Sequence, residues 1–195
     1  RELETLAAGV KAVATWHATD IIQVCREACG GAGYLKASRF AALKADTDVF
    51  TTFEGDNTVL LQLAAKNLLT EYKDQVGDLN PLGMAQFVAG QALGMLAERF
   101  RLPGRDEGGD LLERKTQLEL FKWRHEHVLG GVARRLRKGI GDGGDPFRVL
   151  VDSQDHVLTA ARSWVDLVVL EAFAAVADRD PLLDKLCSLY ALSRI

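Results

Sequence analysis

The stretch "TFEGDNTVLLQLAAKNLLTEY", residues 52–72, decides the class of fold. Its second part is strongly apolar, contains no proline and has the periodicity of a helix that packs against a core. Asp56 or Asn57 stands where an N-cap would lie, because a short polar side chain there accepts hydrogen bonds from the free backbone N–H groups. We therefore predict a helix over residues 58–72, preceded by a polar connection that contains Glu54.

The rest of the chain carries the same kind of pattern. Residues 3–29 have apolar side chains close to a 3.6-residue period, and Gly30, Gly31 and Gly33 then end the predicted helix. Ser38 is a predicted N-cap for a shorter helix that ends near residue 50. Further helices are predicted over residues 81–100, 111–138, 147–177 and 181–193, with loops at 101–110 and 139–146. No segment alternates like a strand, so the predicted fold is all-α, with antiparallel neighbours.

The composition favours a soluble globular protein. Hydrophobic residues make up 48% of the 195 residues and charged residues 26%. No apolar run reaches the roughly 18 residues of a membrane span, and no signal peptide is evident. The net charge of -3 and the few aromatics around the basic segment 134–138 argue against a nucleic-acid partner. The chain begins at Arg1 without Met and stops abruptly, so we expect a piece of a longer intracellular protein.

The cysteines and histidines do not form a metal-binding pattern. Cys25, Cys29 and Cys187 are an odd number with no histidine at ligand spacing, so we predict small buried hydrophobes rather than a metal or redox site. The histidines show no ligand spacing beyond an i, i+2 pair and are interpreted as packing or surface residues: His17, His125, His127 and His156. No metal is expected.

Glu54 has two possible roles. An acid just before a helix N-terminus is usually a cap or a partner of the helix dipole. A general base is the alternative, and it requires burial against apolar groups, which raises the pKa of a carboxyl toward neutrality. Phe53 and Val59 are the candidates for such an apolar wall.

Two polar or glycine-rich groups flank this position. Asp56, Asn57 and Thr58 bring polar side chains and free N–H groups to a helix start, which suits an anion or the edge of a cofactor, although ordinary capping explains them equally well. "CGGAGY", residues 29–34, either lets the backbone approach a ligand or simply stops a helix. No strand precedes these glycines, so they are not the dinucleotide-binding fingerprint.

Taken together, "CREACGGAGYL" and "LKADTDVFTTFEGDNTVLLQLAAKNLL" resemble the C-terminal helical region of acyl-CoA oxidases, which are relatives of the acyl-CoA dehydrogenases. The resemblance is dense from about Thr15 to Leu69 and looser up to "LCSLYALSRI". It implies a helical bundle of the acyl-CoA dehydrogenase C-terminal type over residues 1–78, followed by an additional helical subdomain over residues 79–195.

The resemblance also implies roles for the candidate residues. Glu54 matches the base that removes the α-proton of a fatty acyl-CoA while the β-hydrogen leaves as a hydride to FAD. Gly55 lets the chain pass close to the thioester substrate. The glycine segment resembles one that approaches the FAD of a neighbouring subunit. At the positions of Asp56 and Thr58, dehydrogenase relatives have side chains that contact the flavin nucleotide. The cofactor-binding residues implied in this way are Gly30, Gly31, Gly33, Asp56 and Thr58.

Two departures and the chain length favour the oxidase branch. Dehydrogenases usually have Thr or Ser where this chain has Asp56, and Gln where it has Glu27, so a direct transfer of FAD contacts is weakened while "EGDNT" fits oxidases better. Most of the chain follows Glu54, and such an extension is an oxidase trait. The resemblance thus implies O2 as electron acceptor and a homodimeric parent, cytoplasmic in a bacterium or peroxisomal in a eukaryote.

Two alternatives remain open at this level. One is an acyl-CoA dehydrogenase with an extended C-terminus, and the other is a non-catalytic helical assembly module. Because the flavin- and thioester-binding domains of the family are missing from this sequence, we expect the isolated chain to be inactive and to hold no FAD.

Overall fold

The computed structural model describes residues 1–77 and 110–195, and these residues contain helices and turns but no strand, which confirms the predicted all-α class. The α-helices are α1 (Glu2–Ala28), α2 (Phe40–Asp48), α3 (Asn57–Gly77), α5 (Arg114–Gly141), α6 (Pro146–Asp152), α7 (Gln154–Ala177) and α8 (Pro181–Leu192). Short 3-10 helices lie at η1 (Gly30–Tyr34), η2 (Lys36–Ser38) and η3 (Val49–Thr51). None of the described helices is long and apolar enough to cross a lipid bilayer.

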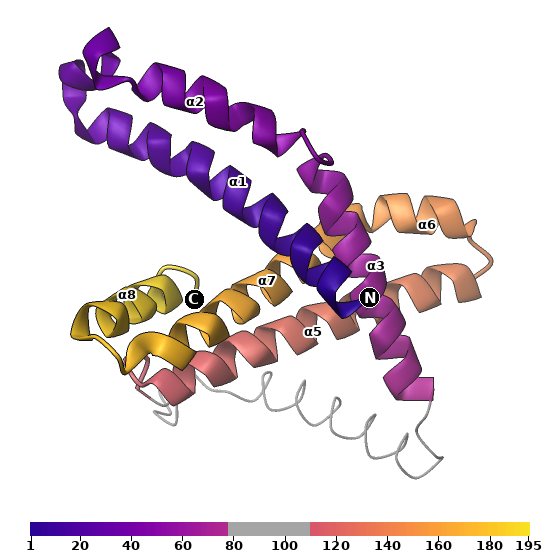
Figure 1. The fold of residues 1–195 in the computed structure, drawn as a ribbon. Helices are drawn as coiled ribbons and strands as arrows, with labels where there is room; N and C mark the ends of the chain where they lie inside the picture. The colour runs from indigo at the N-terminus through magenta and orange to yellow at the C-terminus, as the bar shows by residue number, and fades with distance from the viewer. Residues whose placement is uncertain (78–109) are drawn as a thin grey trace, which may run out of the picture.

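Helices α1 and α2 form a projecting arm (Figure 1). The chain reverses through η1 and η2, and α2 returns antiparallel to α1. The buried residues of α1 all lie in its N-terminal half, from Thr5 to Ala12, and α2 has no buried residue. The outer half of the arm therefore stands clear of the core that the described residues form.

The main core lies where α1, α3, α5 and α7 cross. Its buried members are Ala12, Leu61, Ala64, Ala65, Leu68, Leu129, Val132, Val157, Ala160 and Ala161. Half of these are alanines, which allow the helix backbones to approach closely. Gly9 marks the tightest crossing, because a Cβ there would lie 2.7 Å from Cγ2 of Val165 on α7. The N-terminal helices are thus packed directly against the C-terminal ones.

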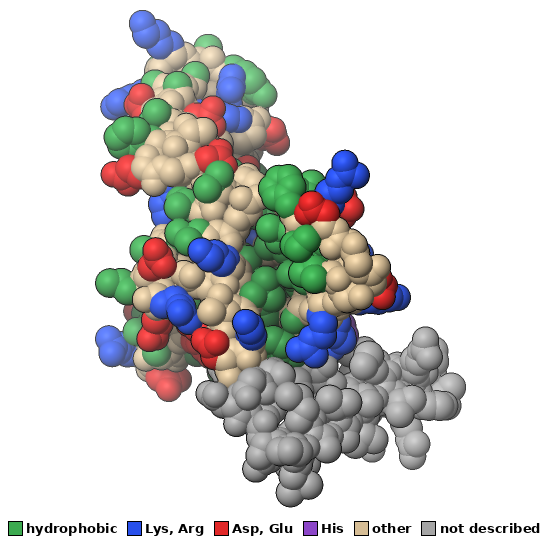
Figure 2. Space-filling model, turned by 90° about the vertical axis from the view of Figure 1, so that its right-hand side faces the viewer, with side chains coloured by type: hydrophobic (Ala, Val, Ile, Leu, Met, Phe, Trp, Pro, Cys, Tyr) green, Lys and Arg blue, Asp and Glu red, His purple; other side chains and the backbone are tan. Residues whose placement is uncertain are grey.

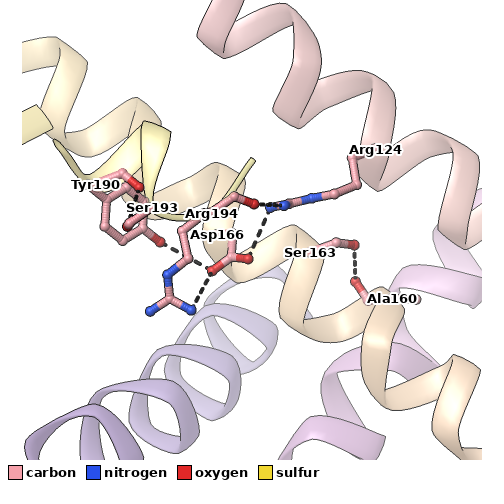
Figure 3. A network of polar contacts seen from close by, with 7 residues as sticks. All are labelled: Arg124, Ala160, Ser163, Asp166, Tyr190, Ser193 and Arg194. Atoms are coloured by element: carbon pink, nitrogen blue, oxygen red, sulfur yellow. Dashed lines mark hydrogen bonds and ion pairs between the residues drawn. The ribbon is translucent and has the colours of Figure 1, made fainter. Parts of the chain in front are cut away.

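A second core joins α8 to α5 and α7. It contains Phe121, Leu167, Leu170, Ala177, Cys187 and Ala191. Beside it, Asp166 on α7 accepts hydrogen bonds from Arg124 on α5 and from Tyr190 on α8 (Figure 3). The polar network and the apolar cluster together fix the C-terminal helix on the bundle.

Apolar surface remains exposed on more than one face. Figure 2 views the side on which α6 lies and shows a band of hydrophobic side chains down the middle of that face. On α6, Phe147, Leu150 and Val151 are exposed. Contiguous apolar surface of this kind usually marks contact with other protein parts.

The predicted helix boundaries differ from the structure at several points. Ser38 does not cap α2: it lies in η2, its hydroxyl donates to the carbonyl of Leu35, and Arg39 occupies the N-cap position without a side-chain bond. Helix α5 continues to Gly141, beyond the predicted end at 138. The predicted helix 147–177 is two helices that part at Ser153.

Helix α6 is capped at its start and packs on α5. Asp145 caps α6 by accepting from the N–H of Phe147, with Pro146 as the first helical residue. Val149 of α6 then packs on Gly139 of α5, where a Cβ would come within 2.6 Å of the valine. No glycine or proline in residues 147–177 announces the break. The predicted helix 81–100 and most of the predicted loop 101–110 lie outside the described residues.

Candidate functional site

Glu54 lies in the turn that joins η3 to α3, and its backbone is unusual. Its φ is 61°, in the left-handed region that a residue with a Cβ rarely adopts, and Gly55 follows with φ 112°. A Cβ on Gly55 would also lie 3.1 Å from Cδ2 of Leu60. Gly55 is therefore needed by the turn itself, whereas the backbone conformation of Glu54 is unfavourable for a residue with a side chain.

The Glu54 side chain is exposed in this part of the protein. Phe53 and Val59, the candidates for an apolar wall, are each 58% exposed, so the described residues do not enclose the carboxylate. Another apolar group could pack on the exposed side chains of Phe53 and Val59 and so cover the carboxylate between them. The burial of the Glu54 carboxylate against apolar groups stays a prediction, and those groups would have to come from outside the described residues.

Asp56 has a clear structural role. Its Oδ1 accepts hydrogen bonds from the backbone N–H groups of Thr58, at 2.8 Å, and of Val59, at 3.3 Å. This confirms the predicted cap of α3 and identifies Asp56, rather than Asn57, as the capping side chain. The Thr58 side chain is partly buried beside it. The cap occupies Oδ1 of Asp56, so any contact with a cofactor would use the other oxygen.

Two side chains of helix α1 form hydrogen bonds with the turn and with the first residue of α3. Nζ of Lys11 donates to the carbonyl oxygen of Gly55, at 2.6 Å, and to Oδ1 of Asn57, at 2.9 Å. Nδ2 of Asn57 donates to Oγ1 of Thr15, at 2.9 Å. Sequence reasoning missed Lys11 and Thr15, because they lie far from the turn in the sequence, 46 and 42 residues before Asn57.

The three candidate glycines differ in what the fold requires of them. A Cβ on Gly33 would lie 2.0 Å from the carbonyl oxygen of Arg26, so Gly33 is required for the chain to fold back on α1. Gly30 has φ 56°, which favours glycine. At Gly31 neither reason applies, since its φ is ordinary and a Cβ would meet nothing within 4 Å. The fold of the described residues therefore requires glycine at residues 30 and 33 but not at residue 31.

The structure does not bring the glycines and Glu54 into one site. Lys11 contacts the Glu54 turn, whereas Gly30 follows the far end of the same helix, 19 residues later. At 1.5 Å of rise per residue this separates the two groups by roughly 28 Å along α1. Figure 1 shows the turn before α3 at the base of the arm and η1 at its tip. The predicted site residues therefore form two locations on this chain.

An apolar groove of about 830 Å³ lies between α1 and α7. Its lining is formed by Leu3, Leu6, Ala7, Val10, Lys11, Val168, Val169, Ala172, Phe173 and Val176. Lys11 belongs to this lining and also reaches the Glu54 turn, although no residue of the turn itself lines the groove. The sequence signal was present in the i, i+3 and i+7 spacing of Leu3, Leu6 and Val10, but it does not reveal that α7 faces them.

The other titratable groups in the described part of the chain form no metal centre. No group of three or more His, Cys, Asp or Glu side chains in residues 1–77 and 110–195 is arranged to hold a metal ion. Cys25 and Cys29 are exposed, contrary to the prediction that all three cysteines are buried, while Cys187 is buried as predicted. The first two lie in the outer half of the arm, where the described residues provide no core.

Comparison with known proteins identifies relatives along the whole chain. The family model "Acyl-CoA oxidase, C-alpha1 domain" matches residues 1–69. The peroxisomal acyl-coenzyme A oxidase 2 of Arabidopsis thaliana is 37% identical over 204 residues, an alignment that covers 100% of this chain. That alignment covers 29% of the Arabidopsis protein, so the chain spans less than a third of this relative's length.

Solved structures agree in fold. Acyl-CoA oxidase 1 of Arabidopsis thaliana superposes with a TM-score of 0.78 at 28% identity, covering 98% of this chain and 29% of that one. Acyl-CoA oxidase-1 of Caenorhabditis elegans, crystallised with FAD and ATP, shares the fold with a TM-score of 0.73 at 22% identity, covering 97% of this chain and 28% of that one. With an all-helical bundle, a family match over the Glu54 turn and relatives along its whole length, the chain belongs to the acyl-CoA oxidase family and corresponds to its C-terminal helical region.

Proposed function

We propose that this chain is the C-terminal helical part of an FAD-dependent acyl-CoA oxidase and that Glu54 is its catalytic base. In the proposed reaction the Glu54 carboxylate accepts the α-proton of an acyl-CoA thioester, which leads to a trans-2-enoyl-CoA. A bound FAD would supply the acceptor for the β-hydrogen as a hydride, and O2 would take up the electrons as hydrogen peroxide. The whole reaction requires protein parts beyond this chain, so the isolated chain should be inactive.

The observation that carries the proposal is the conformation of Glu54. A non-glycine residue in the left-handed region costs free energy and persists only when its surroundings fix it. Here a glycine, a helix cap and a lysine from another helix hold the turn, and the carboxylate still points to an exposed surface. A rigid turn that presents one carboxylate fits a base that must meet a C–H bond in a defined direction.

The glycine segment fits an FAD contact in one respect. Gly31 is exposed, and the space that its Cβ would fill is open. Backbone without a side chain can lie against a flat ring or a phosphate group. Because η1 lies at the tip of the arm, far from Glu54 along α1, its FAD would belong to another subunit, which supports a homodimeric parent. Within the proposed parent, residues 1–78 and 79–195 are the two helical parts.

The test of the base is Glu54→Gln in the full-length enzyme. Loss of a positioned proton acceptor should lower kcat by a factor on the order of 10²–10⁴ while acyl-CoA still binds. Glu126→Gln is the matched control, because Glu126 is an exposed carboxylate on α5. Unchanged turnover in Glu54→Gln would favour a non-catalytic assembly module.

The electron acceptor needs a separate measurement. Stopped-flow reoxidation of the reduced full-length enzyme in air should be fast, with one peroxide formed per enoyl-CoA. A reduced flavin that survives air for minutes would instead identify an acyl-CoA dehydrogenase with an extended C-terminus. The proposed compartment is the peroxisome if the source is a eukaryote, as for the relative from Arabidopsis thaliana, and the cytoplasm if it is a bacterium.

A further inference from the structure

Lys11, Thr15 and Asn57 form a small polar cluster behind the Glu54 turn, which we call the Lys11 clamp. Residues 11 and 15 are four apart on α1 and so lie on the same helix face. Asn57 is the first residue of α3. The clamp therefore fixes the start of one helix to the middle of another.

The hydrogen bonds of the clamp form a consistent chain of donors and acceptors. The Thr15 hydroxyl donates to the carbonyl oxygen of Lys11, at 2.9 Å, and accepts from Nδ2 of Asn57. Oδ1 of Asn57 accepts from Nζ of Lys11. Asn57 is only 1% exposed, so its amide cannot exchange these partners for bulk water. This geometry makes the clamp a specific contact rather than a transient surface pair.

The second bond from Lys11 reaches the turn itself. Nζ lies 2.6 Å from the carbonyl oxygen of Gly55, which is a short, charge-assisted hydrogen bond. The carbonyl group of Gly55 directly follows two consecutive residues with positive φ, Glu54 and Gly55. A backbone in this region of conformational space relaxes unless neighbouring groups hold it. Lys11 is a side chain from another helix that forms a hydrogen bond directly with the turn.

We propose that Lys11 is a positioning residue for the reaction: by holding the Gly55 carbonyl and the Asn57 amide, it fixes the direction in which Glu54 presents its carboxylate. This inference rests on the proposed role of Glu54 as base. Lys11 also lines the apolar groove, so it joins the wall of the groove to the turn. Its action on the reaction is indirect, through the backbone.

A positioning role predicts a particular kinetic signature. Lys11→Met in the full-length enzyme keeps the aliphatic stem but removes the ammonium, and kcat should fall roughly 10- to 100-fold, because a misplacement of about 1 Å at the reacting groups has an effect of that order. The KM for acyl-CoA should change little. The isotope effect of α-deuterated acyl-CoA should rise, because proton abstraction would then limit turnover.

Two variants separate positioning from general stability. Lys11→Arg retains a charged donor and should restore most of kcat. A lysine needed only for stability would not produce a lowered kcat together with an unchanged KM. Lys66→Met is the matched control, since Lys66 is exposed on α3. Should Lys11→Met fail to fold, Thr15→Val removes the acceptor of Asn57 and should lower kcat in the same way to a smaller extent.

The outcomes distinguish this inference from the proposed function. If Glu54→Gln abolishes turnover but Lys11→Met keeps kcat per bound flavin and the isotope effect of the unmodified enzyme, the positioning role is wrong and the base assignment stands. If Glu54→Gln retains full turnover, both are overturned. A lowered kcat with unchanged KM, a raised isotope effect and rescue by arginine would support the positioning role.

Discussion

The hydroxyl of Tyr190 donates a hydrogen bond to Oδ1 of Asp166, 3.2 Å away, and so ties α8 to the middle of α7. Asp166 is only 15% exposed, and its other oxygen accepts from Arg124 at 3.0 Å. Arg124 also donates to the carbonyl oxygen of Arg194, at the C-terminal end (Figure 3). One carboxylate thus holds three segments together: α5, α7 and the end of α8.

Tyr190→Phe should destabilise this attachment. The change removes the donor to Asp166 and keeps the ring that packs against Phe121 and Phe173. A partly buried hydrogen bond of this type contributes about 1 kcal/mol to the free energy of unfolding. Urea unfolding of the two proteins measures the difference, with Tyr34→Phe at the exposed tip of the arm as control. An equal stability of Tyr190→Phe and the unmodified chain would contradict the structural role.

The same tyrosine predicts a dependence on pH. Burial, followed by the negative charge of Asp166, raises the pKa of Tyr190 in the folded state. The neutral phenol is therefore favoured by folding, and its contribution is complete below the ordinary tyrosine pKa of about 10 and declines as the pH rises above it. The stability difference between the unmodified chain and Tyr190→Phe should shrink above about pH 10. Unfolding free energies measured across this range test the sign.

Two neighbouring glycines should respond differently to alanine. Gly33→Ala places a Cβ 2.0 Å from the carbonyl oxygen of Arg26, so the tip of the arm must shift, at a cost of about 1–3 kcal/mol. Gly31→Ala meets no atom within 4 Å and should leave the stability of the chain nearly unchanged. Circular dichroism melting curves of the two variants measure this. In the full-length enzyme Gly31→Ala should instead weaken FAD retention, and normal flavin content would contradict its proposed contact.

The three thiols should differ in reactivity. Cys25 and Cys29 are exposed, whereas Cys187 is buried between α8 and its neighbours. Burial raises the pKa of the Cys187 thiol, so the reactive thiolate is disfavoured as well as shielded. Maleimide labelling at neutral pH followed by mass spectrometry should modify the first two cysteines quickly. Cys187 should react only after unfolding, and its rapid labelling in the native protein would contradict the packing of α8.

His125 should make the fold sensitive to acid. In the described part of the chain its Nδ1 is buried and has no hydrogen-bond partner, and burial lowers the pKa of the side chain. The unfolded chain then takes up a proton more readily than the folded one, so stability is lost as the pH falls below about 6.5. His125→Leu should reduce this loss, as urea unfolding on either side of that pH would reveal. His156→Leu is the control, because His156 is exposed and its replacement shows the effect of removing an imidazole that is not buried.

Local patterns determined much of this protein. The cap at Asp56, the glycine stop after α1 and the apolar periodicity of α3 each depend on residues within a few positions of one another, and short-range hydrogen bonding and helix periodicity predict them. The Glu54–Gly55 turn was also recognisable from its own residues. These features follow from the backbone conformations that each residue type favours.

Tertiary structure decided what depends on distant partners. Lys11 reaches Gly55 across 44 residues of sequence, and Val149 of α6 packs on Gly139 of α5. Cys25 and Cys29 are exposed because they lie in the outer half of α1, where no residue of that helix is buried. Helical periodicity shows that a face is apolar, but which helix covers it is set by packing between segments far apart in the chain, and that information is absent from any local stretch.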